Sequence, residues 1–158
     1  MSEGTDSSTM RQVLGHFPSG VTIVTGTTPD GPAGFTCQSF SSLSLEPPLV
    51  LVLPGRSSSS WPKIEATGRF VVNVLSEEQE ELSTTFAVSG GDKFADLAWR
   101  QGVLGAPILE RTIGHVECRI VYAHEGGDHT IYVGEIECAD VADGEPLVYF
   151  RGAYRGVV

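Results

Sequence analysis

The chain has 158 residues, 41% of them hydrophobic and 19% charged, which are the proportions of an ordinary globular protein with one buried core. Twenty acidic residues against ten basic ones give a formal net charge of -10. That charge argues against nucleic acid and anionic membrane as partners, because both attract basic patches. We expect a disordered polar tail over residues 1–8 and a single domain over residues 9–158.

The cysteines and the lack of a long apolar run bear on location. Cys37, Cys118 and Cys138 are odd in number and form no Cys-x-x-Cys pair, which predicts reduced thiols. No apolar run approaches the roughly 18 residues of a membrane span, and no basic-then-apolar leader opens the chain. The sequence therefore predicts a cytoplasmic protein.

A short amphipathic helix is predicted to begin at Thr9, which has capping-box spacing to Gln12. Pro18 ends this helix, and residues 21–25 form a β-branched strand. The apolar side chains of the helix recur at helical spacing: Met10, Val13, Leu14 and Phe17.

The most informative stretch covers residues 35–61. Residues 35–42 mix small hydroxyls with two aromatic rings in an extended run, which suits a planar heteroaromatic ligand. Pro47 and Pro48 stop any helix. Residues 49–53 are an unbroken apolar run of strand length, predicted to be buried on both faces.

A candidate phosphate site follows. Arg56 and the serines of residues 57–60 precede a short helical pattern over residues 61–67, which Gly68 closes. A helix N-terminus carries free N–H groups and a partial positive charge, and hydroxyls with one guanidinium complete an anion cup. A planar-ring site beside a phosphate cup describes a flavin nucleotide site; the alternative is a flexible polar loop.

The middle of the chain predicts a strand and a helix. Residues 69–75 form the strand, and Ser76 and Gln79 have capping-box spacing before the helix. Leu82 and Phe86 supply the apolar pair of that helix, and Gly90-Gly91 breaks it. Trp99 is predicted to be a buried anchor that stabilises the fold by roughly 4 to 6 kcal/mol before entropy.

The C-terminal third predicts a hairpin and a final strand. Residues 116–123 and 130–139 pair across a link formed by residues 124–129, and residues 146–154 form a last strand and turn. Short strands without strand-helix alternation predict a mainly β, antiparallel barrel with a few short helices.

Several common active-site motifs are missing. The chain has no Gly-x-Gly-x-x-Gly, P-loop, nucleophile elbow or His-Glu-x-x-His. His124, Asp128 and His129 could ligate a metal, but a stable site usually needs three or four convergent ligands. We expect no metal.

Several motifs resemble the flavin reductase family, the small partners of two-component flavin-dependent monooxygenases, built on an FMN-binding split barrel. Residues 34–51 carry the clearest likeness, with the run Gly-Phe-Thr-Cys-Gln-Ser-Phe-Ser-Ser-Leu-Ser-Leu-Glu-Pro-Pro-Leu-Val-Leu. The likeness extends to residues 15–21, where Ser19 replaces the usual threonine, and to Asp92-Lys93-Phe94 and Gly127-Asp128-His129. The resemblance implies a Greek-key split β-barrel.

The resemblance also implies site residues. In this family the segment from Thr36 to Phe40 would border the isoalloxazine ring, and Ser42 would face the ribityl chain. Arg56 or Lys63 joins the serines on the phosphate. The implied ring contacts are Thr36, Cys37, Gln38, Ser39 and Phe40; the phosphate serines are Ser57, Ser58 and Ser59; Lys93 and Phe94 serve the phosphate and the ring edge; and Pro18, Ser19, His129 and Tyr154 are ring or nicotinamide contacts.

Each assignment has a structural alternative. Cys37 is better read as a small packing residue than as a nucleophile. The alternative for Lys93 is a solvated side chain on a capped turn. Pro18 and Ser19 can be a plain helix stop. His129, the candidate catalytic residue, covers a ring face or bonds the nicotinamide amide, or else stabilises its turn.

The function implied by resemblance is an NAD(P)H-dependent flavin reductase. It reduces FAD or FMN with NADH or NADPH, releases the product to a separate monooxygenase, and works as a homodimer. Hydride transfer needs two stacked rings about 3 to 3.5 Å apart rather than a strong acid or base. The alternatives are a flavin carrier or sensor without turnover, and an oxidase or deazaflavin-dependent relative.

Overall fold

The computed structural model describes residues 4–157, and strands dominate it. The helices are short: α1 (Ser7–Gly15), α2 (Trp61–Glu65), the 3-10 turn η1 (Glu77–Gln79) and α3 (Glu80–Ala87). The strands are β1 (Ser19–Gly20), β2 (Thr22–Thr28), β3 (Gly31–Cys37), β4 (Phe40–Leu45), β5 (Pro48–Val52), β6 (Arg69–Val74), β7 (Trp99–Gln101), β8 (Pro107–Leu109), β9 (Gly114–Gly126), β10 (His129–Val141), β11 (Val148–Phe150) and β12 (Ala153–Arg155).

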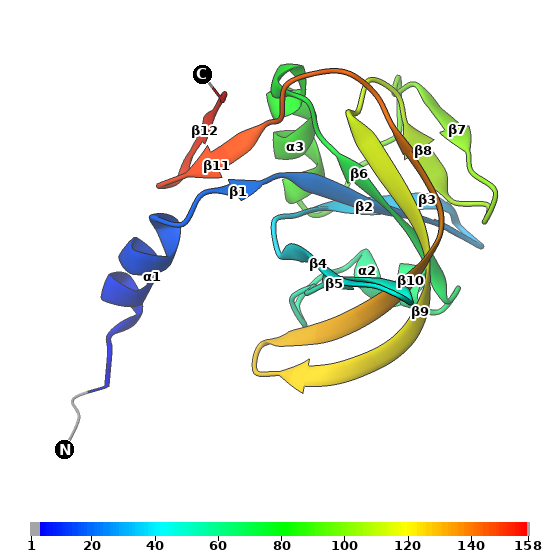
Figure 1. Cartoon of the computed structure of the whole chain (residues 1–158). Coiled ribbons are helices and arrows are strands. Elements are labelled where there is room, and N and C mark those ends of the chain that lie inside the picture. The colour runs from blue at the N-terminus through cyan, green and yellow to red at the C-terminus, as the bar shows by residue number, and fades with distance from the viewer. Residues whose placement is uncertain (1–3, 158) are drawn as a thin grey trace.

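A curled antiparallel sheet organises the chain (Figure 1). Its strand order is β3-β2-β6-β9-β10-β5-β4, so consecutive strands β3 and β4 lie at opposite edges. Only Gln38 and Ser39 separate those two strands in the sequence. The sheet must therefore curl until its edges approach, and the Leu53 N–H donates to the Ser39 carbonyl at 3.0 Å beside this seam. The mainly β, antiparallel prediction is confirmed.

Two large apolar clusters and a small third one, formed by Val71, Ala106 and Ile108, fill the interior. Trp61 is 4% exposed and packs edge-on against Phe35, Phe70 and Tyr132, with ring centroids 6.0, 5.8 and 4.8 Å away. Phe86 of α3 belongs to the second cluster. Helix α2 contacts β2, β3 and β6, whereas α3 contacts β2 and β3. Both helices therefore contact β3, α2 with its buried side chains in the Trp61 cluster and α3 with Phe86 in the second cluster.

Helix α1 differs from its prediction. It begins at Ser7, because the Asp6 carboxylate caps it by accepting from the Thr9 N–H at 2.8 Å. Thr9 is therefore inside the helix, and the predicted capping box is wrong. The predicted tail overlaps α1 at Ser7 and Ser8, and residues 1–3 lie outside the described part of the chain.

Three further elements correct the predictions. In β5, Val50 and Val52 are buried while Leu49 is half-buried, because only one face of this strand turns into the core. The long hairpin pairs from His129 and Gly126 onwards, so the predicted link shrinks to two residues between β9 and β10. The last predicted strand is a second hairpin, β11 and β12, whose pairing with β1 forms a three-stranded sheet.

Two other local predictions hold, whereas Trp99, predicted to be a buried anchor, is 37% exposed. The Gln79 side chain accepts from the Ser76 N–H at 3.0 Å, as the capping-box spacing predicts. Gly90 and Gly91 follow α3 with positive φ values of 86° and 73°, which glycine adopts readily. Among residues 4–157, no helix has the length and apolar character needed to cross a bilayer.

Candidate functional site

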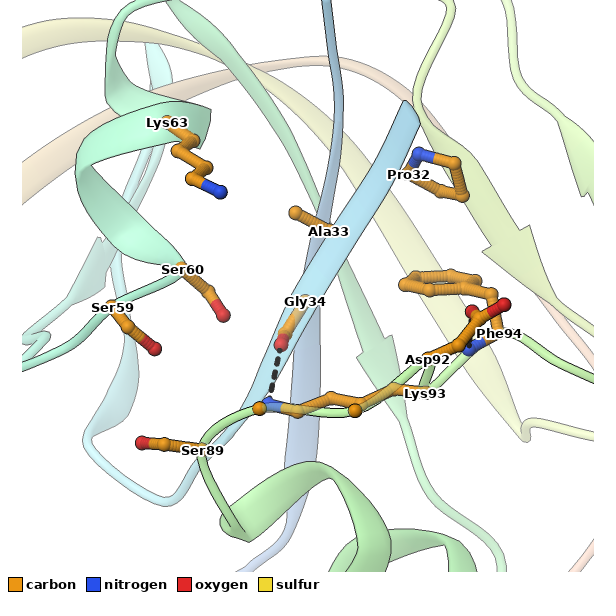
Figure 2. Close-up of a pocket in the computed structure, with 12 residues that line it drawn as sticks. Pro32, Ala33, Gly34, Ser59, Ser60, Lys63, Ser89, Asp92, Lys93 and Phe94 are labelled. Atoms are coloured by element: carbon orange, nitrogen blue, oxygen red, sulfur yellow. Dashed lines mark hydrogen bonds between the residues drawn. The ribbon is translucent and has the colours of Figure 1, made fainter. Parts of the chain in front are cut away.

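A cavity of about 470 Å³ lies where three segments meet. One wall is the start of β3, the second is the approach to α2, and the third is the loop that follows α3 (Figure 2). Four predicted site residues line it: Ser59, Lys63, Lys93 and Phe94. The serine run already included Ser60, but the family resemblance did not assign it or the remaining lining residues, Pro32, Ala33, Gly34, Ser89, Gly90, Gly91 and Asp92.

Lys93 is held in place at the cavity floor. Its Nζ donates to the Gly34 carbonyl and to the Phe86 carbonyl, each at 3.2 Å, and lies 5.8 Å from the Phe86 ring centroid. Figure 2 shows the side chain running along the cavity to Gly34. Partial burial lowers the pKa of the Lys93 ammonium. An ammonium has three N–H donors, so one remains for a ligand.

The opposite wall carries hydroxyls and a second cation. Ser60 precedes α2 and makes no side-chain capping bond, so its hydroxyl is available to the cavity. Lys63 lies 4.0 Å from the exposed Asp30 carboxylate, a distance and exposure at which an ion pair contributes little. Hydroxyls and two ammonium groups around one cavity form a donor set that suits a phosphate dianion.

The predicted phosphate cup needs correction in three respects. Helix α2 has only five residues, so its terminal dipole is a minor contribution beside Lys63 and Lys93. Ser58 Oγ accepts from the Trp61 N–H at 3.2 Å and therefore caps the first turn. Arg56 turns away, with its guanidinium 3.9 Å from the Glu125 carboxylate.

The predicted ring segment lies at the seam between β3 and β4. Thr36 Oγ1 donates to the Ser83 carbonyl of α3 at 2.6 Å. Cys37 is buried, and desolvation raises the pKa of its thiol to about 11, so it is a packing residue and not a nucleophile. Gln38, Ser39 and Ser42 are exposed, and Phe40 is half-buried against the Trp61 cluster.

His129 is joined to the turn that precedes the serine run. It forms an antiparallel bridge with Gly55, and the neighbouring Arg56 N–H donates to the Asp128 carbonyl at 2.9 Å. His129 Nδ1 lies 2.7 Å from Asp128 Oδ1, and this hydrogen bond lowers the pKa of the Asp128 carboxyl. Ser57 directly follows Arg56 in the sequence. The His129 imidazole therefore lies beside the start of the serine loop.

The predicted nicotinamide contacts divide between two places. Pro18 directly precedes β1, and Ser19 is the first residue of β1 and pairs with Tyr149. Tyr154 Oη lies 2.8 Å from Ser83 Oγ. Figure 1 shows β12 and the tip of the β9–β10 hairpin, where β10 begins at His129, at opposite ends of the molecule. One chain therefore does not bring Tyr154 and His129 together.

The overlooked residues differ in how visible they are in the sequence. Ser60 belongs to the serine run and was within reach of that pattern. Gly34 has a steric reason: a Cβ there would lie 3.0 Å from the Phe86 ring and 3.0 Å from the Val24 carbonyl. Ser89 carries no local signal for a place in the cavity. Ser83 carries none either, because its partners Thr36 and Tyr154 lie 47 and 71 residues away in the sequence.

Comparisons with known proteins agree on one family. A sequence model of the flavin reductase like domain matches residues 14–157. The reductase subunit HsaB of a flavin-dependent monooxygenase from Mycobacterium tuberculosis H37Rv is 45% identical over 99% of this chain and 86% of its own. The FMN reductase (NADH) SmoA from Agrobacterium fabrum is 46% identical, over 96% and 86% of the two chains.

A solved structure extends the likeness to three dimensions. The NADH:FAD oxidoreductase SgcE6 from Streptomyces globisporus, in complex with NAD and FAD fragments, superposes with a TM-score of 0.92. It is 37% identical, and the match covers 97% of this chain and 93% of that one.

Proposed function

The chain belongs to the flavin reductase-like family, and from this premise we propose that its cavity holds the phosphate end of a flavin nucleotide that NADH reduces. The flavin is a substrate, FAD or FMN, which leaves in its reduced form. The observation that carries the proposal is the convergence of Lys93, Lys63, Ser59 and Ser60 on one cavity next to the strand that leads to the seam.

The chain's own groups bind and align the substrates, and the two rings supply the redox chemistry. Lys93 keeps one N–H for the phosphate because Gly34 and Phe86 take the other two. The segment from Thr36 to Phe40 borders the ring, with backbone groups near its polar edge. His129, oriented by Asp128, covers a ring face or bonds the nicotinamide amide. NADH plus a proton and the oxidised flavin give NAD⁺ and the reduced flavin.

The first prediction tests turnover directly. We expect purified protein to consume NADH steadily in the presence of either free FMN or free FAD, at about 1 to 10³ turnovers per second. In air the reduced flavin reoxidises, so a small amount of flavin sustains many turnovers. The measurement is the loss of absorbance at the nicotinamide band.

The same assay separates the reductase from a carrier or sensor. A carrier binds flavin, visible as a change in flavin fluorescence, while NADH consumption stays at the rate of flavin alone. That result would overturn the proposed function. Repeating the assay with NADPH ranks the two nicotinamide donors; the names of SmoA and SgcE6 favour NADH.

We also propose the finer architecture and the setting of this family. The curled seven-stranded sheet is a Greek-key split barrel whose edges meet at Gln38 and Ser39, within one domain over residues 9–158. The reduced flavin passes to a separate monooxygenase, as the name of HsaB states for that relative. Free thiols at all three cysteines suit a cytoplasmic location.

A homodimer is supported by helix α1. No residue of Ser7–Gly15 is buried, and Figure 1 shows the helix projecting from the body of the chain. Its apolar side chains are exposed: Met10 by 47%, Val13 by 66%, Leu14 by 64% and, just after the helix, Phe17 by 81%. A contiguous apolar face on an extended helix is typical of an interface, and a second copy of the chain is our proposed partner.

The second prediction concerns this interface. We expect the protein to sediment as a dimer and Leu14→Glu to shift it towards single chains, because the substitution places a charge on the apolar face. Gln12→Glu adds the same charge to the polar side of the same helix and should leave the dimer intact. A wild-type protein that sediments as one chain at micromolar concentration would contradict the proposal.

A further inference from the structure

The hydroxyl of Ser83 behaves unlike its neighbours on α3. Thr84 and Thr85 are exposed, and their hydroxyls donate to carbonyls of the same helix, those of Glu80 and Glu81, at 3.2 and 3.1 Å. That is the usual arrangement for a hydroxyl inside a helix. Ser83 is fully buried, and its Oγ instead lies 2.8 Å from Tyr154 Oη.

The backbone of Ser83 has a second partner, Thr36 of β3. Its carbonyl accepts a hydrogen bond from Thr36 Oγ1 at 2.6 Å. Thr36 lies 47 residues before Ser83 and Tyr154 lies 71 residues after it. Two residues that the family resemblance assigns to ring or nicotinamide contacts therefore meet at one residue that it does not assign.

Helix α3 is fixed firmly enough to transmit this arrangement. The Phe86 ring packs where a Cβ on Gly34 would stand, at 3.0 Å, so the helix sits directly against β3. Lys93 then joins the end of α3 to β3 through the carbonyls of Phe86 and Gly34. A displacement of Ser83 would therefore shift both Thr36 at the seam and Tyr154 in the β11–β12 hairpin.

We propose that Ser83 is a positioning residue for hydride transfer. Its hydroxyl sets the Tyr154 side chain and its carbonyl sets Thr36, so that the edge of the flavin site and the β11–β12 hairpin keep one spacing. This inference rests on the proposed function, because it takes the roles of Thr36 and Tyr154 from it. A misplaced contact of about 1 Å can slow a reaction between two rings markedly.

The experiment compares Ser83→Ala with Thr85→Ala on the same helix. We expect Ser83→Ala to lower kcat with NADH about tenfold and to alter the fluorescence of bound flavin, while Thr85→Ala matches wild type. Flavin affinity should change less than kcat, because the proposed phosphate-binding side chains, Lys93 and Ser60, are unchanged. Equal kcat values for the two variants would overturn the inference.

A second variant guards against a purely structural effect. Tyr154→Phe removes the same hydrogen bond from its half-buried partner. If the bond itself positions the reactants, Ser83→Ala and Tyr154→Phe lower kcat by similar factors, and the double variant loses no more than either alone. Multiplying losses, or losses that vanish when activity is normalised to the folded fraction, would overturn it.

The two proposals fail in distinguishable ways. If wild-type protein does not oxidise NADH in the presence of flavin, the proposed function fails. If wild type turns over and Ser83→Ala turns over equally well, the proposed function stands and the role of Ser83 fails.

Discussion

Replacing Lys93 by methionine is expected to weaken flavin binding by about 30- to 150-fold, the equivalent of roughly 2 to 3 kcal/mol for a hydrogen bond to a charged group. Methionine keeps an apolar stem against Phe86 but removes the donor and the charge. The effect is large because Lys93 is half-buried and already oriented by Gly34 and Phe86, so little ordering is needed when the phosphate arrives. Titration of flavin fluorescence measures it.

Lys63→Met is the matched control. Lys63 is exposed and only loosely paired with Asp30, so the same change there should weaken binding by less than about tenfold. The thermal unfolding midpoint of each variant shows whether the protein binds poorly or has merely unfolded. Equal affinities for wild type and Lys93→Met would remove Lys93 from the phosphate site.

Titration gives Lys93 a second signature. Burial lowers the pKa of its ammonium, and the charged form binds phosphate, so affinity falls as pH rises through that lowered pKa. The loss should start at a pH below the ordinary lysine value of about 10.4. Lys93→Met should lack this dependence, whereas Lys63→Met should keep it.

Sequence patterns predicted the local features of the fold, those that are determined by residues close together in the chain. The Ser76 capping box and the break at Gly90 follow from local chemistry, and the structure contains both. The resemblance brought Lys93 and Phe94 to the cavity, but Arg56 points to Glu125 instead. A serine run cannot say which hydroxyls face a ligand, because that depends on how the loop meets the β9–β10 hairpin.

Contacts between residues far apart in the chain could not be predicted from sequence patterns. Ser83 looks like any hydroxyl in a helix, and its role arises only when β3 and β12 reach it from distant parts of the chain. Burial was equally hard to read for tryptophan. Trp99 was predicted to be the anchor, yet it is 37% exposed on β7, at the edge of a two-stranded sheet. Trp61, 4% exposed, occupies the core.

Trp61→Ala should therefore be the most destabilising substitution considered, at about 3 to 5 kcal/mol, because it removes the ring shared by Phe35, Phe70 and Tyr132. Trp99→Ala removes the same side chain from an exposed place and should cost roughly 1 to 2 kcal/mol. At about 2 to 4 °C per kcal/mol, differential scanning calorimetry resolves the two shifts in unfolding temperature.

The Trp61 prediction also connects the core to the site. Trp61 is the first residue of α2, directly after Ser59 and Ser60 and one turn before Ile64, whose side chain is fully buried. Any folded Trp61→Ala protein should hold the two serines and Lys63 less firmly, and should bind flavin more weakly than Trp99→Ala at the same temperature. If Trp99→Ala unfolded first, the burial that distinguishes the two tryptophans would not govern stability; if folded Trp61→Ala bound flavin as wild type does, the approach to α2 would not form part of the phosphate site.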